Sequence, residues 1–230
     1  MCRHFAWLGE PRSLAELILE PEHGLLTQSH HPRRQRHGRI NADGWGVGYY
    51  PGEGSLPARW RSDRPLWGSE SFRSVAPTIT STCVIGAVRD ASPGMPIDES
   101  AAAPFLSGRW MMSHNGRVDR DVLGPQPDAE SMCDSAQLAA LVFARGADEI
   151  GKIVAEIGAR DPDARLNVLL TNGERILATT WGDTLSTLRT DAGVLVASEP
   201  FDDDPAWVDV PQRSLVTVVN GVVTVTTLES

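Results

Sequence analysis

The chain has 230 residues and a formal net charge of −9 at pH 7, with 41% hydrophobic and 22% charged residues. This length is enough to bury a full hydrophobic core, and we expect a single domain over residues 1–230. An acidic chain without a long basic face is a poor partner for nucleic acid or an anionic membrane. No stretch approaches the roughly 18 apolar residues of a membrane span. We therefore predict a globular protein that binds neither nucleic acid nor membrane.

The N-terminus has no basic region followed by an apolar stretch, so we expect no secretory signal and a cytoplasmic location. Met1 would then be the true start, and the small residue after it would allow removal of the methionine. The three cysteines, Cys2, Cys83 and Cys133, are few and odd in number, which favours free thiols over disulfides. The six histidines lack carboxylate or cysteine partners at metal-ligand spacing, so we expect no metal and no cofactor.

The first half of the chain alternates short strands and loops. Residues 2–8 read as a buried strand, and Ser13 begins a helix through a capping box with Glu16. A polar stretch over residues 28–41 follows, and a glycine-broken strand is expected over residues 44–50. The polar stretch is basic and contains Arg33, Arg34, Arg36 and Arg39.

The middle of the chain predicts two further strands, over residues 82–88 and 109–114, separated by a long loop over residues 91–105. Two helices are expected after them, over residues 131–145 and 147–159. Cys83 lies within the first of these strands and reads as a small buried hydrophobic residue.

The C-terminal third predicts strands over residues 166–170, 175–180, 194–197, 215–219 and 222–227. Asn172-Gly173 and Asn220-Gly221 are typical of hairpin turns, so this part should be antiparallel. Strands on both sides of a central helix pair predict an α+β layered fold.

Cys2 is the first candidate for chemistry. Once Met1 is removed, it carries a thiol and a free α-amine, whose ordinary pKa of about 7.7–8.0 leaves part of it unprotonated at neutral pH. One residue then supplies both a nucleophile and a general base. Taken alone this is a weak signal, because many chains begin Met-Cys by chance.

Asn115-Gly116 is the second candidate. A side-chain amide beside a glycine N–H can direct two donors at one oxygen, which makes an oxyanion hole. On its own, the pair is more typical of a hairpin turn.

Three further residues could bind a charged ligand. Arg89 follows a strand and can bind a carboxylate in bidentate fashion, with Ser92 three residues later as a second donor. The plainer interpretation is a surface arginine and a loop hydroxyl. Asp134 lies at a helix start, where a carboxylate either caps the helix or pairs with a substrate ammonium.

Together these segments form a known pattern. Cys2-Arg3, Asp43–Gly46, Arg89–Ser92, His114–Gly116 and Asp134-Ser135 occur in the order found in class II glutamine amidotransferases. The chain resembles that family from Cys2 to about residue 200. The resemblance implies an N-terminal-nucleophile hydrolase with a four-layer αββα sandwich, acting on a small γ-glutamyl amide.

The resemblance also implies a role for each residue. Cys2 would be the nucleophile with its α-amine as base, and Asn115 and Gly116 would form the oxyanion hole. The glutamyl zwitterion would be bound by Arg89, Ser92 and Asp134. Family members that feed a synthetase often have an acidic residue at the position of Ala136 and a histidine near Pro93, so the match is weaker for that branch.

Three functions remain open at this point. The first is hydrolysis of a γ-glutamyl amide larger than glutamine, with the basic stretch at residues 30–37 either lining the leaving-group side or forming a solvated loop. The second is a glutaminase subunit that passes ammonia to a separate synthetase. The third is a non-enzymatic binder, which would require Met1 to be retained. Trp45 and Trp110 could face a cationic ligand but are more typical of core residues. The oligomeric state is not predicted.

Overall fold

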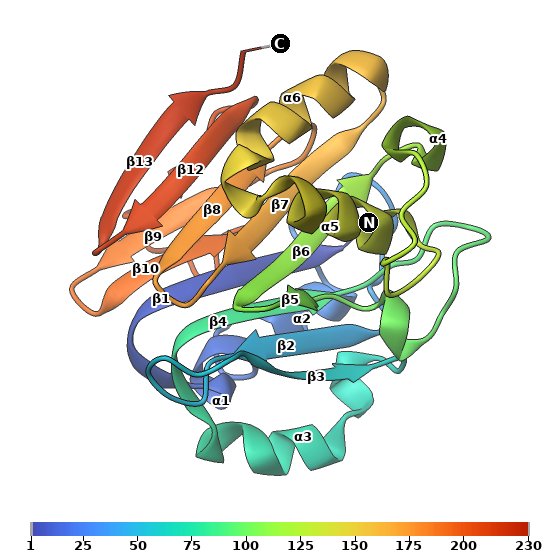
Figure 1. The fold of residues 1–230 in the computed structure, drawn as a ribbon. Coiled ribbons are helices and arrows are strands. Elements are labelled where there is room, and N and C mark those ends of the chain that lie inside the picture. Colours follow the sequence, from blue (N-terminus) through green and yellow to red (C-terminus); the bar gives the residue numbers. More distant parts are fainter. Residues whose placement is uncertain (1, 230) are drawn as a thin grey trace.

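Two antiparallel β-sheets stack face to face in the protein, whose computed structural model describes residues 2–229 (Figure 1). The first sheet has the order β11 (Val208–Asp209), β9 (Ser186–Thr190), β10 (Gly193–Ala197), β1 (Arg3–Ser13), β4 (Thr80–Val88), β2 (Trp45–Tyr49) and β3 (Ala58–Ser62). The second has the order β13 (Val222–Thr227), β12 (Ser214–Val219), β8 (Arg175–Thr180), β7 (Arg165–Thr171), β6 (Trp110–Arg117) and β5 (Phe105–Ser107). The N-terminal strand β1 is therefore central in its sheet.

Helices cover the outer face of each sheet (Figure 1). The first sheet is covered by α1 (Leu14–Ile18), α2 (Leu25–His30) and α3 (Glu70–Val75), and the second by α5 (Asp134–Arg145) and α6 (Ile150–Arg160). The short helix α4 (Arg120–Leu123) follows β6, and single 3-10 turns occur at Leu66–Gly68, Ala76–Thr78, Glu99–Ala101 and Ala147–Glu149. Within the described range 2–229, no helix is long and apolar enough to cross a membrane.

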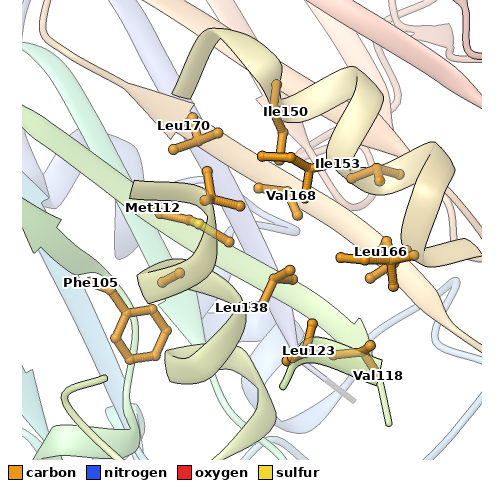
Figure 2. Packing of buried hydrophobic residues seen from close by; sticks show 14 of the residues in the cluster. Phe105, Met112, Val118, Leu123, Leu138, Ile150, Ile153, Leu166, Val168 and Leu170 are labelled. Carbon is orange, nitrogen blue, oxygen red and sulfur yellow. The ribbon is translucent and has the colours of Figure 1, made fainter. Parts of the chain in front are cut away.

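Three hydrophobic clusters separate the four layers. On β1, Phe5 and Trp7 face the α1–α3 side, whereas Ala6 between them faces the second sheet, as the two-residue period of a strand requires. The cluster under α5 and α6 packs residues such as Leu138 and Ile153 against Val168 of β7 (Figure 2). The α+β class and the αββα order expected from the resemblance are confirmed.

Local signals in the sequence account for several element boundaries. Ser13 and Glu16 make both hydrogen bonds of the predicted capping box at the start of α1. Asn220 and Gly221 have φ angles of 50° and 71°, the left-handed conformation that a tight hairpin between β12 and β13 needs. Cys83 is fully buried in β4, as predicted.

Other expectations need correction. β6 continues through Arg117, so Asn115-Gly116 lies within a strand paired to β7 and is not a hairpin turn. β1 runs to Ser13, well beyond the predicted residue 8. The strands β3, β5, β9 and β11 and the helices α2, α3 and α4 were not predicted.

Candidate active site at the start of the central strand

The position of Cys2 follows from strand register. Arg3 pairs with Val88, the last residue of β4. Because the two strands are antiparallel, Cys2 lies opposite Arg89, the residue that follows β4. On the other side of β1, Phe5 pairs with Ala197, so the chain that leaves β10 passes the start of β1. The Cys2 side chain is a half-buried free thiol, and the removal of Met1 lies outside the described residues.

A small pocket brings Cys2 together with residues from three separate segments. It is lined by Arg89 after β4, by His114 on β6 and by Ser135 on α5. Trp45, Ala101 and Phe105 are among its apolar walls. The pocket therefore joins the nucleophile candidate to the carboxylate-binding candidate, although they are far apart in sequence.

Asn115 is fully buried on β6, one residue beyond His114. Its amide Nδ2 donates to Asp183 Oδ2 at 3.3 Å and to Ser198 Oγ at 3.4 Å. A carboxylate attracts the NH2 end of an amide and repels the oxygen, so Asp183 fixes the amide orientation. Asn115 Oδ1 is buried without a hydrogen-bond partner among residues 2–229.

A buried ion pair supports this arrangement and was not predicted. Arg3 Nη2 lies 3.2 Å from Asp183 Oδ2, and both side chains have no exposed surface. Asp183 also accepts a hydrogen bond from the backbone N–H of Thr184 through its other oxygen. Cys2 and Arg3 are adjacent in the chain but differ in exposure. The Cys2 side chain is partly accessible to solvent, whereas the Arg3 side chain is completely buried. An arginine inside a strand that otherwise reads as buried was the available signal, because buried charges require a partner.

Arg89 is 8% exposed and lies under the loop that follows β4. Its backbone N–H donates to the carbonyl of Gly44, and its Nη1 donates to the carbonyls of Pro96 (2.9 Å) and Asp43 (3.4 Å). Among the residues that the structure describes, its guanidinium forms no ion pair with a carboxylate. It therefore keeps the capacity to bind one. Ser92 lies half-buried in the same loop, and its carbonyl accepts from Met95 N–H.

Asp134 is the first residue of α5 and is 7% exposed. Its Oδ2 accepts from Val118 N–H at 3.1 Å and its Oδ1 from Ser135 N–H at 2.9 Å. The N-cap itself is Cys133, whose Sγ accepts from Ala136 N–H, so Asp134 is not the capping residue that the sequence also allowed.

His114 sits beside Cys2 with both ring nitrogens engaged. Nε2 lies 2.8 Å from the carbonyl of Arg165 and must donate to it, so Nδ1 is left to accept from Ser135 Oγ at 2.9 Å. Burial lowers the pKa of His114, and the nearby Asp134 carboxylate opposes this only in part. His114 is therefore a neutral imidazole whose nitrogens are committed to the fold.

The other two cysteines are unsuited to nucleophilic chemistry. Burial raises the pKa of Cys83 to about 12, although Thr171 Oγ1 lies within hydrogen-bonding distance. Burial also raises the pKa of Cys133. The thiolate is the nucleophilic form, so both are inert at neutral pH. No group of His, Cys, Asp and Glu within residues 2–229 is arranged to hold a metal.

Comparisons with known proteins identify the family to which this chain is similar. Residues 25–190 match the family model of class-II glutamine amidotransferases. The chain is 60% identical over 228 residues to the gamma-glutamyl-hercynylcysteine sulfoxide hydrolase of Mycolicibacterium smegmatis, a match that covers 99% of this chain and 100% of that protein. It is 56% identical over 229 residues to the hydrolase of the same name from Mycobacterium tuberculosis, covering 100% of this chain and 97% of that protein.

Solved structures show the same fold at low sequence identity. A glutamine aminotransferase class-II domain protein from Silicibacter pomeroyi matches with a TM-score of 0.72 and 19% identity over the whole of both chains. The glutamine phosphoribosylpyrophosphate amidotransferase of Bacillus subtilis matches with a TM-score of 0.73 and 15% identity, over 100% of this chain and 49% of that one. The N-terminal-nucleophile fold that the resemblance implied is confirmed.

Proposed function

Because the chain belongs to the class II glutamine amidotransferases, we propose that it hydrolyses the γ-glutamyl amide of γ-glutamyl-hercynylcysteine sulfoxide, a step of ergothioneine biosynthesis, and releases glutamate. The full-length identity of 60% and 56% to hydrolases of that name supports this substrate. The observation that carries the chemistry is the half-buried Cys2 thiol, which shares a small pocket with Arg89, whose guanidinium forms no ion pair with any side chain of residues 2–229.

The nucleophile in this proposal is the Cys2 thiol, and its own α-amine is the base once Met1 is removed. The amine accepts the thiol proton while sulfur attacks the amide carbonyl, forming a C–S bond and a tetrahedral oxyanion. The C–N bond then breaks, and the leaving amine takes the proton back. Water attacks the resulting thioester, the C–S bond breaks, and glutamate and the free thiol are released.

His114 is the alternative base in the pocket, but its contacts argue against that role. Nε2 already carries a proton directed at the carbonyl of Arg165, and Nδ1 accepts from Ser135. Neither nitrogen is free to accept a proton from the Cys2 thiol. The α-amine of Cys2 is the remaining base, because it belongs to the same residue as the thiol.

Asn115 and Gly116 are the proposed oxyanion donors. Asn115 Nδ2 has two hydrogen-bond contacts, at 3.3 Å to Asp183 and at 3.4 Å to Ser198. We assign the hydrogen directed at Ser198, the longer contact, to the oxyanion. The unpaired Oδ1 can accept from the α-amine. Each donor of this kind typically contributes about 2.7–4 kcal/mol to the transition state.

The glutamyl end of the substrate is a zwitterion, and the proposed site offers one group of each charge. Arg89, with Ser92 beside it, is assigned to the α-carboxylate. Asp134 is assigned to the α-ammonium. Binding at this end would hold the γ-amide against Cys2, which lowers the entropic cost of the attack.

The test measures glutamate release by the Met1-processed protein from γ-glutamyl-hercynylcysteine sulfoxide and, in parallel, from glutamine. We expect rapid release from the conjugate, little from glutamine, and none from a Cys2→Ala variant. Mass spectrometry of the quenched reaction should show a glutamyl adduct on Cys2, and Cys83→Ala should remain active.

Release from glutamine alone would contradict the proposed substrate and indicate an ammonia-supplying glutaminase. Undiminished activity of Cys2→Ala, or of a protein that retains Met1, would contradict the proposed mechanism.

A further inference from the structure

The basic loop over residues 31–40 is anchored at its first end by a fully buried carboxylate. The backbone N–H groups of Arg33 and Arg34 donate to the two oxygens of Glu199, at 3.0 and 2.6 Å. The side chains of both arginines are also engaged, in ion pairs with Asp203 and Asp209. These two arginines therefore hold the loop in place.

The second end of the loop is bonded to α2 and lies against the segment that follows β4. The Asn41 side chain donates to the carbonyl of Gln28 and to Gln35 Oε1, at 2.8 and 3.0 Å. Gly38 has a φ of 73°, and a Cβ at this position would collide with the carboxylate of Asp90. The loop backbone thus lies directly against Asp90, the residue after Arg89.

These two anchors flank the nucleophile. Glu199 follows β10 by two residues and Asp90 follows β4 by two residues, and β10 and β4 are the two neighbours of β1. A loop that is hydrogen-bonded to Glu199 and lies against Asp90 crosses the end of β1 at which Cys2 lies. Residues 35–38 lie between these two contacts and form the part that crosses, and Arg39 follows directly after it.

The basic side chains on this crossing and directly after it differ from those at the first anchor. Arg36, His37 and Arg39 are exposed, and no side chain of residues 2–229 forms a hydrogen bond or an ion pair with them. Two unpaired guanidinium groups close to the nucleophile, on a chain of net charge −9, make a local site for anions. Arginine suits carboxylates, which it can bind through two parallel hydrogen bonds.

The leaving amine of the proposed substrate carries negatively charged carboxylates, whereas the ammonia released from glutamine carries none. This leaving amine is a cysteine sulfoxide joined to a trimethylated histidine. The α-carbon of the cysteine, which bears the cleaved nitrogen, also bears one carboxylate, and the trimethylated histidine bears a second. Resting on the proposed function, we infer that the loop over residues 31–40 is the subsite for the leaving amine, with Arg36 and Arg39 binding its carboxylates. The loop selects the conjugate over glutamine.

The test compares two substrates that share the glutamyl group and differ on the leaving side. One is γ-glutamyl-hercynylcysteine sulfoxide, and the other is γ-glutamyl methylamide, which has no carboxylate on that side. For Arg36→Ala/Arg39→Ala we expect kcat/KM on the conjugate to fall roughly tenfold, mainly through KM, because two exposed charge pairs are lost. Hydrolysis of the methylamide should stay unchanged. Arg189→Ala is the matched control, since Arg189 is an exposed arginine at the far end of the same sheet.

Ionic strength gives a second readout that a purely structural role of the loop would not change. Salt screens exposed charges, so KM of the parent enzyme for the conjugate should rise with salt, and KM of the double variant should respond much less. An unchanged KM for the conjugate in the double variant overturns the inference, and so does an equal loss on both substrates. If the parent enzyme does not hydrolyse the conjugate, the proposed function itself fails before any variant is compared.

Discussion

Asp183 is a residue on which several parts of the candidate site depend. One of its oxygens lies within 3.2 Å of Arg3 and 3.3 Å of the Asn115 amide. Arg3 adjoins Cys2, the proposed nucleophile, and Asn115 is the proposed oxyanion donor. A single buried carboxylate therefore contacts the neighbour of one proposed catalytic group and the side chain of the other.

Replacing this carboxylate tests the positioning role. Asp183→Asn keeps the size of the side chain but leaves the Arg3 guanidinium buried and uncompensated, which typically costs about 3–5 kcal/mol of stability. We expect the urea midpoint to fall accordingly and kcat to fall more than KM rises, because Asn115 loses its orientation. Glu156→Gln, which breaks the exposed pair with Arg145 on the outer helices, is the control and should change neither quantity appreciably. A stable Asp183→Asn enzyme with unaltered kcat would contradict the role.

The site could be predicted from the sequence only in part. Cys2, Arg89 and Asn115 were found because each sits in a short motif, and the pocket and buried network now place them at one end of β1; their catalytic roles remain predictions. Asp183 carried no such motif. It reaches Arg3 across 180 residues, and a single sequence does not reveal a pairing at that separation.

At the scale of elements, the close approach of β6 and β7 depends on Gly116. A Cβ at this position would collide with the carbonyl of Arg165 and crowd His114 Nε2, which donates to that same carbonyl. The backbone here can approach its neighbour only without a side chain. The glycine beside Asn115 is therefore required by the sheet, in addition to its proposed role as an oxyanion donor.

Gly116→Ala should separate the two strands locally. We expect a loss of about 1–3 kcal/mol in the free energy of unfolding, typical of overpacking, together with a large loss of kcat. Gly52→Ala is the matched control, since a Cβ there meets no atom within 4 Å. Full activity of Gly116→Ala at unchanged stability would show that the strand tolerates the side chain and that the proposed oxyanion geometry is wrong.

Elements with a strong local signal were predicted and weakly patterned ones were not. β8 and β13 match their predicted bounds, because turn residues fix their ends and β-branched residues fill them. β3 is half-buried throughout and carries two arginines, and β11 has only two residues. Edge strands of this kind lack the alternation of apolar and polar residues that identifies a strand in a sequence. They have only one pairing partner and often carry charged residues.

At the scale of the whole molecule, the layer order follows from pairings that join distant segments. β1 lies between β10 and β4, so the first strand of the chain is enclosed by a strand from near its end. Composition and periodicity predicted strands and helices but not the αββα layers, which the family resemblance implied, and the order of the strands within each sheet was not predicted. Enclosure in the sheet centre is what buries His4 and Arg3 beside a cysteine that remains partly accessible.

Burial of two histidines between the layers links the stability of the whole fold to pH. Burial lowers the pKa of His4 well below 6.5, and the charge of Arg3 lowers it further. The Nδ1 of His4 lies 3.1 Å from Ser113 Oγ, while Nε2 is buried without a partner in the described chain. Burial likewise lowers the pKa of His114, so both imidazoles are neutral in the folded protein.

In the unfolded chain these histidines recover an ordinary pKa near 6.5, so below that pH the unfolded state binds more protons than the folded state. The free energy of unfolding should therefore fall as pH decreases from 6.5 towards 5, by at most about 1.4 kcal/mol per pH unit for each histidine. Carboxylates with lowered pKa, such as Glu130 beside Arg59, act in the same direction but only below about pH 4.5, so the contributions of the histidines and the carboxylates fall in different pH ranges.

Urea unfolding at several pH values measures the slope of the free energy of unfolding against pH, and His4→Gln should reduce this slope to about half. A free energy of unfolding that stays constant between pH 7 and 5 would mean that both histidines take up protons in the folded state.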